Sequence, residues 1–178
     1  MSEARLEKGE SGLVPADDGW FVLNAADADW KTGSFGSYTT FEGRKDGGRM
    51  FERMGFNISR LEPGQPMCHY HGEDDQEAFL ILKGDALLLV EEQERALKEW
   101  DLVHMPAWVE HVIVGAGEGC TVLAFGTRSG EDVRYPRSEL ALRHGAGVEE
   151  ETSDPEVSYK DIPPDAPTAF AADWLPRG

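Results

Sequence analysis

Cysteine, basic residues and long apolar runs are all scarce in this sequence. Its 178 residues include two cysteines, Cys68 and Cys120, which are too few for the disulfide framework of a small secreted domain, so we expect free thiols. Lysine and arginine number 17 against 34 aspartates and glutamates, which gives a formal net charge of −17. A field of that sign repels phosphate backbones and anionic lipids, so we expect neither nucleic acid nor membrane partners.

The longest apolar runs, at residues 78–82 and 86–90, are far shorter than the roughly 20 residues that a membrane-spanning helix needs. The first residues contain no apolar stretch of the kind found in secretory signals, so a cytoplasmic location is our expectation. Apolar residues make up 40% of the chain and charged residues 29%, which is close to the globular average. The length suits one domain with a core of its own.

Residues 49–127 are a succession of short apolar runs separated by Gly, Pro or charged turns, as is typical of antiparallel all-β folds. We predict eight strands, which favours a closed or sandwiched barrel: 49–61, 66–71, 77–82, 85–91, 94–98, 101–105, 109–114 and 119–127.

The segments on either side of this barrel are expected to be irregular. In the first, only Gly19 to Leu23 has the pattern of a strand, and residues 33–48 are expected to be loops. In the last, Ser138 is predicted to cap one short helix that Gly145 ends. Aromatic residues near the end, among them Trp174, are expected to pin that segment onto the barrel or a second subunit. We therefore divide the chain into an N-terminal extension, a barrel and a C-terminal extension: 1–48, 49–127 and 128–178.

The densest chemistry lies between Gly64 and Gly84. Alternate side chains of a strand share a face, so His69 and His71 are expected to project together while Cys68 points the other way. Two imidazoles side by side can chelate one ion. Glu77 opens the next predicted strand, where a carboxylate entering an apolar barrel needs a cation to offset its desolvation.

A further histidine, His111, follows on a later strand. It shares strand parity with Val109 and Ile113, both apolar, so we expect it to face the interior. Three imidazoles and a carboxylate suit a divalent transition metal (Fe, Mn, Ni, Cu or Zn), with open coordination positions for water or substrate. The predicted metal ligands are His69, His71, Glu77 and His111.

In these residues the sequence resembles the cupin superfamily. The first cupin motif contains Gly, His-x-His, Glu and Gly, and the second contains Gly, Pro-x-Gly, His and Asn. The second is matched by Pro106 and His111, but Trp100 and Trp108 replace its glycines and Gly115 replaces its Asn. The first motif is matched by Gly64, His69, His71, Glu77 and Gly84. The resemblance implies a double-stranded β-helix, or jelly-roll, barrel with a bound metal, often assembled as a homodimer.

The acidic ligand is open to more than one assignment. Five residues separate His71 from Glu77, whereas the family motif has three or four. Strict family spacing therefore favours Asp75 or Gln76, while Glu77 keeps the six-residue gap to Gly84. Strand parity does not decide, because both faces of residues 77–82 are apolar.

Pocket lining gives the only indication of a substrate. If the ligand-bearing strands face inward, their apolar neighbours share the cavity with the metal. Such a wall favours an aromatic or aliphatic organic acid, enol or similar small molecule that binds the metal through oxygen. The predicted lining residues are Met67, Phe79, Ile81, Val109, Ile113 and, from the preceding strand, Phe56.

Several activities are compatible with this site. The resemblance implies dioxygenases, isomerases and lyases as the usual outcomes, and we rank an oxidoreductase with dioxygenase-like chemistry first. A non-catalytic protein that binds metal or a small ligand is one alternative, and a non-redox isomerase or hydrolase is another. No separate general base stands out in the sequence, so proton transfer is assigned to the metal site itself.

Overall fold

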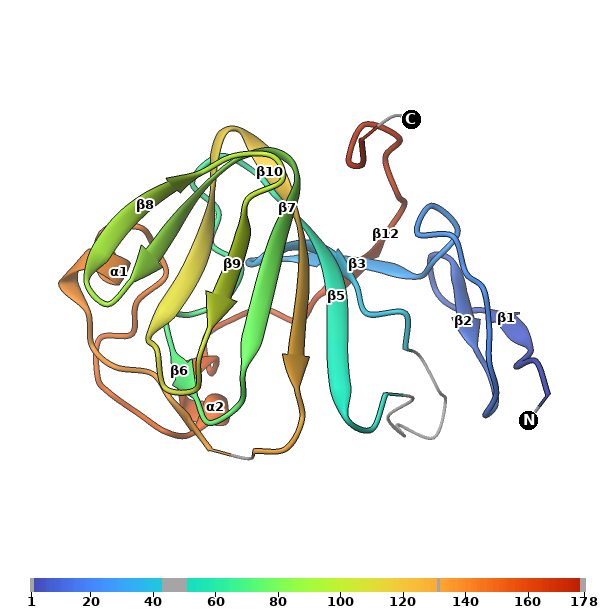
Figure 1. Ribbon diagram of the computed structural model, residues 1–178, viewed down its shortest axis with the longest axis horizontal. Coiled ribbons are helices and arrows are strands. Elements are labelled where there is room, and N and C mark those ends of the chain that lie inside the picture. Colours follow the sequence, from blue (N-terminus) through green and yellow to red (C-terminus); the bar gives the residue numbers. More distant parts are fainter. Residues whose placement is uncertain (1, 43–50, 131, 177–178) are drawn as a thin grey trace.

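The computed structural model describes residues 2–42, 51–130 and 132–176, and its regular structure is mainly antiparallel β-strand (Figure 1). The main sheet has the order β12-β3-β4-β5-β10-β7-β8, and β9 pairs with β7 off this path. Its strands are β3 (Trp30–Gly33), β4 (Gly36–Thr39), β5 (Met54–Leu61), β7 (Glu77–Val90), β8 (Gln93–Leu97), β9 (Leu102–Met105), β10 (His111–Thr127) and β12 (Ala166–Thr168). The predicted all-β class is confirmed.

Two long strands, β7 and β10, form the centre of the sheet and pair from His111 opposite Val90 to Gly126 opposite Glu77. The sequence predicts four strands here, whereas the structure has two that bend. The bend in β7 lies at Gly84, which has a φ of +77°. A Cβ there would lie 2.1 Å from the backbone oxygen of Gly119, so this glycine lets two strands approach closely instead of ending one.

The predicted strand at residues 66–71 is wrong. Only isolated bridges occur there, from Pro66 to Val114 and from His71 to His111. The two bridges are separated by bends, so the period-two alternation of a strand does not apply to the side chains between them.

The N-terminal segment contains more strand than the sequence predicts. Within the range expected to be loops, β4 pairs with both β3 and β5 and so extends the main sheet; residues 43–48 of that range lie outside the described part of the chain. Another pair, β1 (Leu6–Lys8) and β2 (Leu13–Pro15), lies farther out. The strand predicted from Gly19 to Leu23 is wrong, since only Trp20 makes a bridge, to Glu3.

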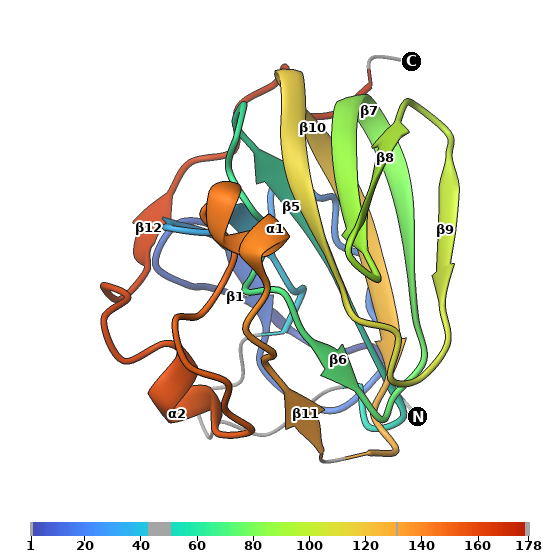
Figure 2. The ribbon, with the colours of Figure 1, turned by 90° about the vertical axis from the view of Figure 1, so that its left-hand side faces the viewer.

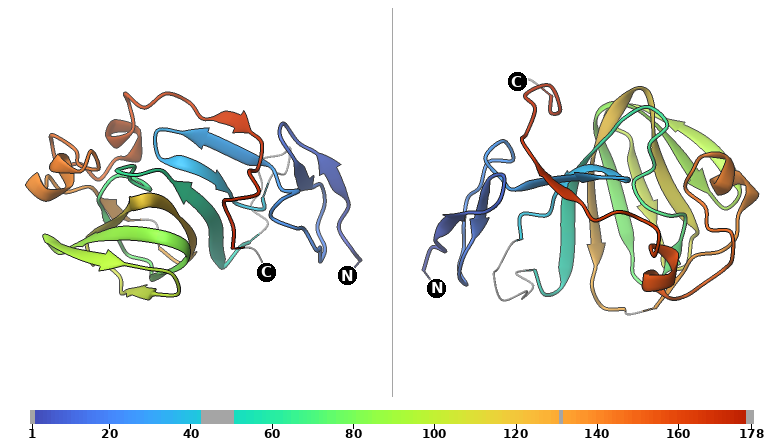
Figure 3. Two further views of the ribbon diagram at one scale, coloured as in Figure 1. Left: turned by 90° about the horizontal axis from the view of Figure 1, so that it is seen from above. Right: turned by 180° about the vertical axis from the view of Figure 1, so that it is seen from behind.

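The predicted C-terminal helix is confirmed as α1 (Glu139–Arg143), whose first turn is capped by the Ser138 side chain. A second helix, α2 (Pro155–Ser158), was not expected. The segment after α2 crosses the domain and adds β12 to the edge of the sheet, beside β3 (Figure 3). The Trp174 ring then packs on the buried Trp30 ring at 5.0 Å between centroids, which confirms that this segment is pinned to the domain.

Two apolar clusters fill the domain. One lies inside the folded sheet and the other packs α1 against the sheet's outer face, around Tyr70 (Figure 2). Both cysteines are free thiols, as predicted. The inner cluster consists of Leu61, Phe79, Ile81, Ala86, Leu88, Val103, Met105, Ile113, Cys120, Val122 and Ala124. In the described chain no helix has the length and apolarity needed to cross a bilayer.

Trp100 and Trp108, which replace motif glycines, keep the glycine conformation. Their φ angles are +72° and +69°, values that a bulky side chain rarely adopts. Both rings are exposed, at 66% and 50%. The turns therefore retain their shape with a strained residue in place of the glycine.

Candidate metal centre

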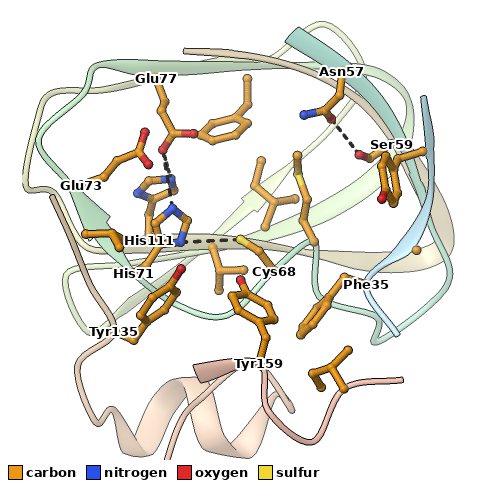
Figure 4. Close-up of a pocket in the computed structure, with 18 of the residues that line it drawn as sticks. Phe35, Asn57, Ser59, Cys68, His71, Glu73, Glu77, His111, Tyr135 and Tyr159 are labelled. Carbon is orange, nitrogen blue, oxygen red and sulfur yellow. Dashed lines mark hydrogen bonds and ion pairs between the residues drawn. The ribbon is translucent and has the colours of Figure 1, made fainter. Parts of the chain in front are cut away.

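Three of the four predicted ligands come together in the structure. Ligand atoms of His71, Glu77 and His111 all lie within 4.8 Å of one another. Backbone pairing explains this, because the N–H of His111 donates to the carbonyl of His71 at 2.8 Å and the reverse bond measures 3.2 Å. Glu77 opens β7 opposite Gly126 of β10 and directs its carboxylate toward the same point (Figure 4).

Both imidazoles are oriented by backbone carbonyls. The Nδ1 of His71 donates to the carbonyl oxygen of His69 at 2.8 Å, and the Nδ1 of His111 donates to that of Val109 at 2.9 Å. With the proton held on Nδ1, the Nε2 lone pair of each ring faces Glu77. This is how proteins fix the tautomer of a metal-binding histidine.

The atoms that face one another here lack partners. Glu77 Oε2 lies 3.0 Å from His111 Nε2 and 3.9 Å from His71 Nε2. Both Glu77 Oε2 and His111 Nε2 are buried without a hydrogen bond. Two acceptors at 3.0 Å need a cation or a proton between them. The donor set therefore fits a divalent transition metal.

Protonation of the two histidines follows from the same geometry. Burial lowers the pKa of His111, but the Glu77 carboxylate 3.0 Å from its Nε2 outweighs this effect, so the net shift is upward. Burial and the neighbouring His111 lower the pKa of His71. Without a metal, His111 is therefore the imidazole that takes up the proton beside Glu77.

Of the three candidates for the acidic ligand, the structure places Glu77 beside the imidazoles and the others elsewhere. Asp75 Oδ1 accepts hydrogen bonds from the hydroxyls of Thr127 and Ser129 at 2.6 and 2.7 Å. These bonds tie two loops together and do not face the histidines. Gln76 is exposed.

His69, the remaining predicted ligand, is not in this group. Its Nδ1 is hydrogen-bonded to Ser158 Oγ at 2.7 Å, and its ring is stacked on Tyr159 at 4.6 Å and an interplanar angle of 7°. The shared face expected for His69 and His71 depends on a strand that does not form. The structure therefore places His69 under α2, apart from the other three ligands.

Two further side chains lie at this end of the cavity. Glu73, on β6 (Gly72–Glu73), presents its carboxylate beside Glu77 (Figure 4). Burial, with the charge of Glu77, raises the pKa of Glu73 to about 7. Cys68 lies 3.6 Å from His71 Nδ1 and lines the cavity, contrary to its expected orientation. Burial raises the pKa of its thiol. Sequence reasoning missed Glu73 because it lies in an acidic loop without periodicity.

The three ligands open into a cavity of about 720 Å³, within the usual range for small-molecule sites. Of the predicted lining residues, Met67, Phe79 and Ile113 line it. The structure does not place Ile81, Val109 or Phe56 there. Ile81 lies in the inner core and Val109 packs against that core.

Phe56 lies on the opposite face of β5, where it packs on Phe51 at 4.4 Å between ring centroids. The alternation of β5 instead directs Asn57 and Ser59 toward the cavity. The prediction was therefore one residue out of register on this strand. As a result, the cavity wall has polar side chains here where we expected apolar ones.

The C-terminal segment completes the wall. Tyr159 and residues 162–165 line the cavity together with Tyr135, which lies beyond β11 (Val133–Arg134). Two contacts of Tyr159 hold this wall in place. Its ring stacks on the His69 ring, and its hydroxyl accepts a hydrogen bond from the His69 backbone N–H at 3.2 Å.

Comparisons with known proteins bear on the family. Residues 57–125 match the family model described as a cupin domain. None of the curated proteins compared with the chain matches it. Among solved structures, a candidate sugar phosphate isomerase from Acidithiobacillus ferrooxidans ATCC 23270 is 24% identical with a TM-score of 0.46. That match covers 55% of this chain and 61% of the other, which is less than two thirds of its length.

Two other solved structures are similar. KdgF from Halomonas sp. is 12% identical with a TM-score of 0.49, over 58% of this chain and 91% of that one. A mutant salicylate 1,2-dioxygenase from Pseudoaminobacter salicylatoxidans is 19% identical with a TM-score of 0.41, over 45% of this chain and 22% of that one. We draw no conclusion about the reaction from likenesses this distant.

The family assignment depends on the matched segment and its contents. It begins in β5, ends in β10, and contains His71, Glu77 and His111. The predicted cupin-type fold is thereby confirmed, and residues 57–125 form a domain of the cupin superfamily.

Proposed function

We propose that this chain is a metal-dependent enzyme that acts on a small organic molecule with dioxygenase-like chemistry, using His71, Glu77 and His111 as metal ligands. The observation that supports this most directly is the pair of buried, unpartnered atoms, Glu77 Oε2 and His111 Nε2, at the cavity wall. A buried carboxylate that faces imidazole lone pairs is costly unless a cation joins them.

Two histidines and one carboxylate with open positions are the donor set of non-haem Fe(II) oxygenases. Iron bound there would supply redox chemistry with dioxygen that no side chain of this cavity provides. The protein's own part is to fix the two Nε2 atoms through the backbone carbonyls and to surround the substrate. The aromatic rings of Phe79, Tyr135 and Tyr159 give the cavity apolar surface around the substrate.

Elemental analysis of untagged protein, followed by oxygen-uptake measurements after anaerobic loading with Fe(II), tests this proposal. We expect about one metal ion per chain, and oxygen uptake that depends on a substrate and is lost in His111→Ala. The same uptake in wild type and His111→Ala would contradict the proposal. Turnover that consumes no oxygen would indicate a non-redox isomerase or hydrolase instead of an oxygenase. Binding of a ligand without turnover would indicate a non-catalytic binding protein.

We also propose a homodimer. Trp100 and Leu102 expose large apolar side chains beside one another on the edge around β9, at 66% and 65%, and such residues favour protein contacts. Sedimentation equilibrium of wild type against a Trp100→Ser, Leu102→Ser double variant measures this. A monomeric wild type would contradict it.

A further inference from the structure

The part of the cavity wall formed by Tyr38, Thr40, Asn57 and Ser59, here called the distal wall, is polar. Figure 4 shows Asn57 and Ser59 across the cavity from Glu77. They come from β5, the strand next to β10 in the sheet, and therefore belong to the same rigid framework as the metal ligands. Nothing in the metal centre makes use of them.

The distal wall presents free hydrogen-bond donors. The Ser59 hydroxyl donates to Asn57 Oδ1 at 2.9 Å, which fixes the amide plane and leaves Nδ2 directed into the cavity (Figure 4). Within the described part of the chain, Asn57 Nδ2 donates no hydrogen bond, and the bond to Oδ1 is the one hydrogen bond of this side chain. A fixed amide with two free N–H groups is suited to a ligand oxygen.

The C-terminal segment adds a second polar group beside this wall. The Tyr38 hydroxyl donates to Asp165 Oδ2 at 2.8 Å, and both residues line the cavity. Burial, with the charge of Asp165, raises the pKa of Tyr38, so this hydroxyl stays a neutral donor.

The charge of the lining restricts the ligand further. Besides Glu77, four carboxylates line the cavity: Glu73, Asp74, Asp132 and Asp165. Among the described lining residues there is no lysine or arginine. A divalent ion held by Glu77 retains about one positive charge, which does not balance an anionic ligand and these carboxylates together.

We infer, on the basis of the proposed function, that the ligand is a neutral polyhydroxylated molecule. One of its oxygens reaches the metal end, and a hydroxyl at its other end accepts a hydrogen bond from Asn57 Nδ2. The rings of Phe35 and Tyr159, which meet edge to face at 5.5 Å, cover its C–H surface. This differs from the organic acid that the sequence favours, because the register of β5 replaces an apolar wall by Asn57 and Ser59.

Binding of matched neutral and acidic probes tests this inference. We would titrate D-glucose against D-glucuronate, and glycerol against glycerate, into protein of measured metal content, and follow binding by saturation-transfer NMR. The variants are Asn57→Asp, which keeps the shape of the side chain but replaces its donors by a charge, and Asn24→Asp as control. Asn24→Asp makes the same substitution outside the cavity, where Asn24 Oδ1 accepts a hydrogen bond from the N–H of Ala26.

The expected result is that the neutral member of at least one pair binds more tightly than its acid. Asn57→Asp should weaken that binding about tenfold or more, while Asn24→Asp leaves it unchanged and all three proteins hold equal metal. Tighter binding of the acids, binding of no probe, or equal binding in Asn57→Asp would each overturn the inference. A wild type that takes up no metal overturns the proposed function separately, because the metal content is measured apart from the titration.

Discussion

Two histidine-bearing regions of the molecule differ in how their polar atoms are satisfied. At the metal end, Glu77 Oε2 and His111 Nε2 are buried and lack hydrogen bonds. Under α2, the Nδ1 of His69 is hydrogen-bonded to Ser158, and the His69 ring stacks on Tyr159. Buried polar atoms are nearly always paired unless they have another use. The difference teaches that the first region is built for a ligand and the second for holding the C-terminal segment.

The largest expected effect comes from removing a ligand. His71→Ala or His111→Ala should weaken metal affinity by at least about 100-fold, since a structural ion derives several kcal/mol from each ligand. Metal at a hundredfold excess over its Kd should raise the free energy of unfolding of wild type by about 2.7 kcal/mol. The unfolding temperature of wild type should rise accordingly, whereas that of either variant should not change. Metal titrations followed by calorimetry and thermal unfolding measure both. If either variant bound metal as tightly as wild type, the proposal that this region is built for a metal and the His69 region is not would be wrong.

An intermediate effect is expected at the other histidine. His69→Ala should keep metal affinity within about threefold while costing about 1–3 kcal/mol of stability, because it removes the hydrogen bond to Ser158 and the ring stacked on Tyr159. Hydrogen exchange should rise in residues 154–165, and limited proteolysis should cut there first. If His69→Ala loses metal as severely as His71→Ala, His69 belongs among the ligands and the two regions are one.

The smallest effect is expected at an exposed residue of the turn before β9. In the monomer, Trp100→Gly should leave stability unchanged or raise it by about 1 kcal/mol, since glycine relieves the left-handed backbone while the exposed indole contributes little packing within the chain. Chemical denaturation of metal-free protein, diluted below the concentration at which the proposed dimer forms, measures this. A loss of more than about 2 kcal/mol would show that the indole has a structural contact, and with it a role that neither histidine region explains.

Much of the fold was predictable from short-range patterns. Turn residues and alternating apolar runs indicate the strands around β7 and β10, and Ser138 followed by Glu139 indicates α1. The sequence does not reveal that Gly84 bends one strand instead of separating two, because that depends on the backbone of Gly119 across the sheet. Strands β3, β4 and β12 were missed because pairing with neighbouring strands, and not their own apolarity, stabilises them.

The candidate site was predictable where motif and register agree. Glu77 and His111 each begin a strand, β7 and β10, at the positions that the motifs indicate. The register pairs Glu77 with Gly126 and His111 with Val90, so their side chains meet through the folding of the whole sheet and not as cross-strand partners. His69 and Phe56 differ from expectation because parity arguments need a continuous strand in known register. Glu73 and Asn57 were missed for a related reason, as neither an acidic loop nor a polar strand residue carries a sequence signal of facing a cavity.

The position of Tyr159 and Asp165 in the cavity wall has a consequence for biosynthesis. The ribosome extends a chain at about 5–20 residues per second, so residues 57–125 emerge some seconds before the segment that encloses their cavity. In a nascent chain the three ligands are therefore available before Tyr159 and Asp165 can join the cavity wall. Trp174 docks on Trp30 later still, and this contact anchors the segment that carries Asp165.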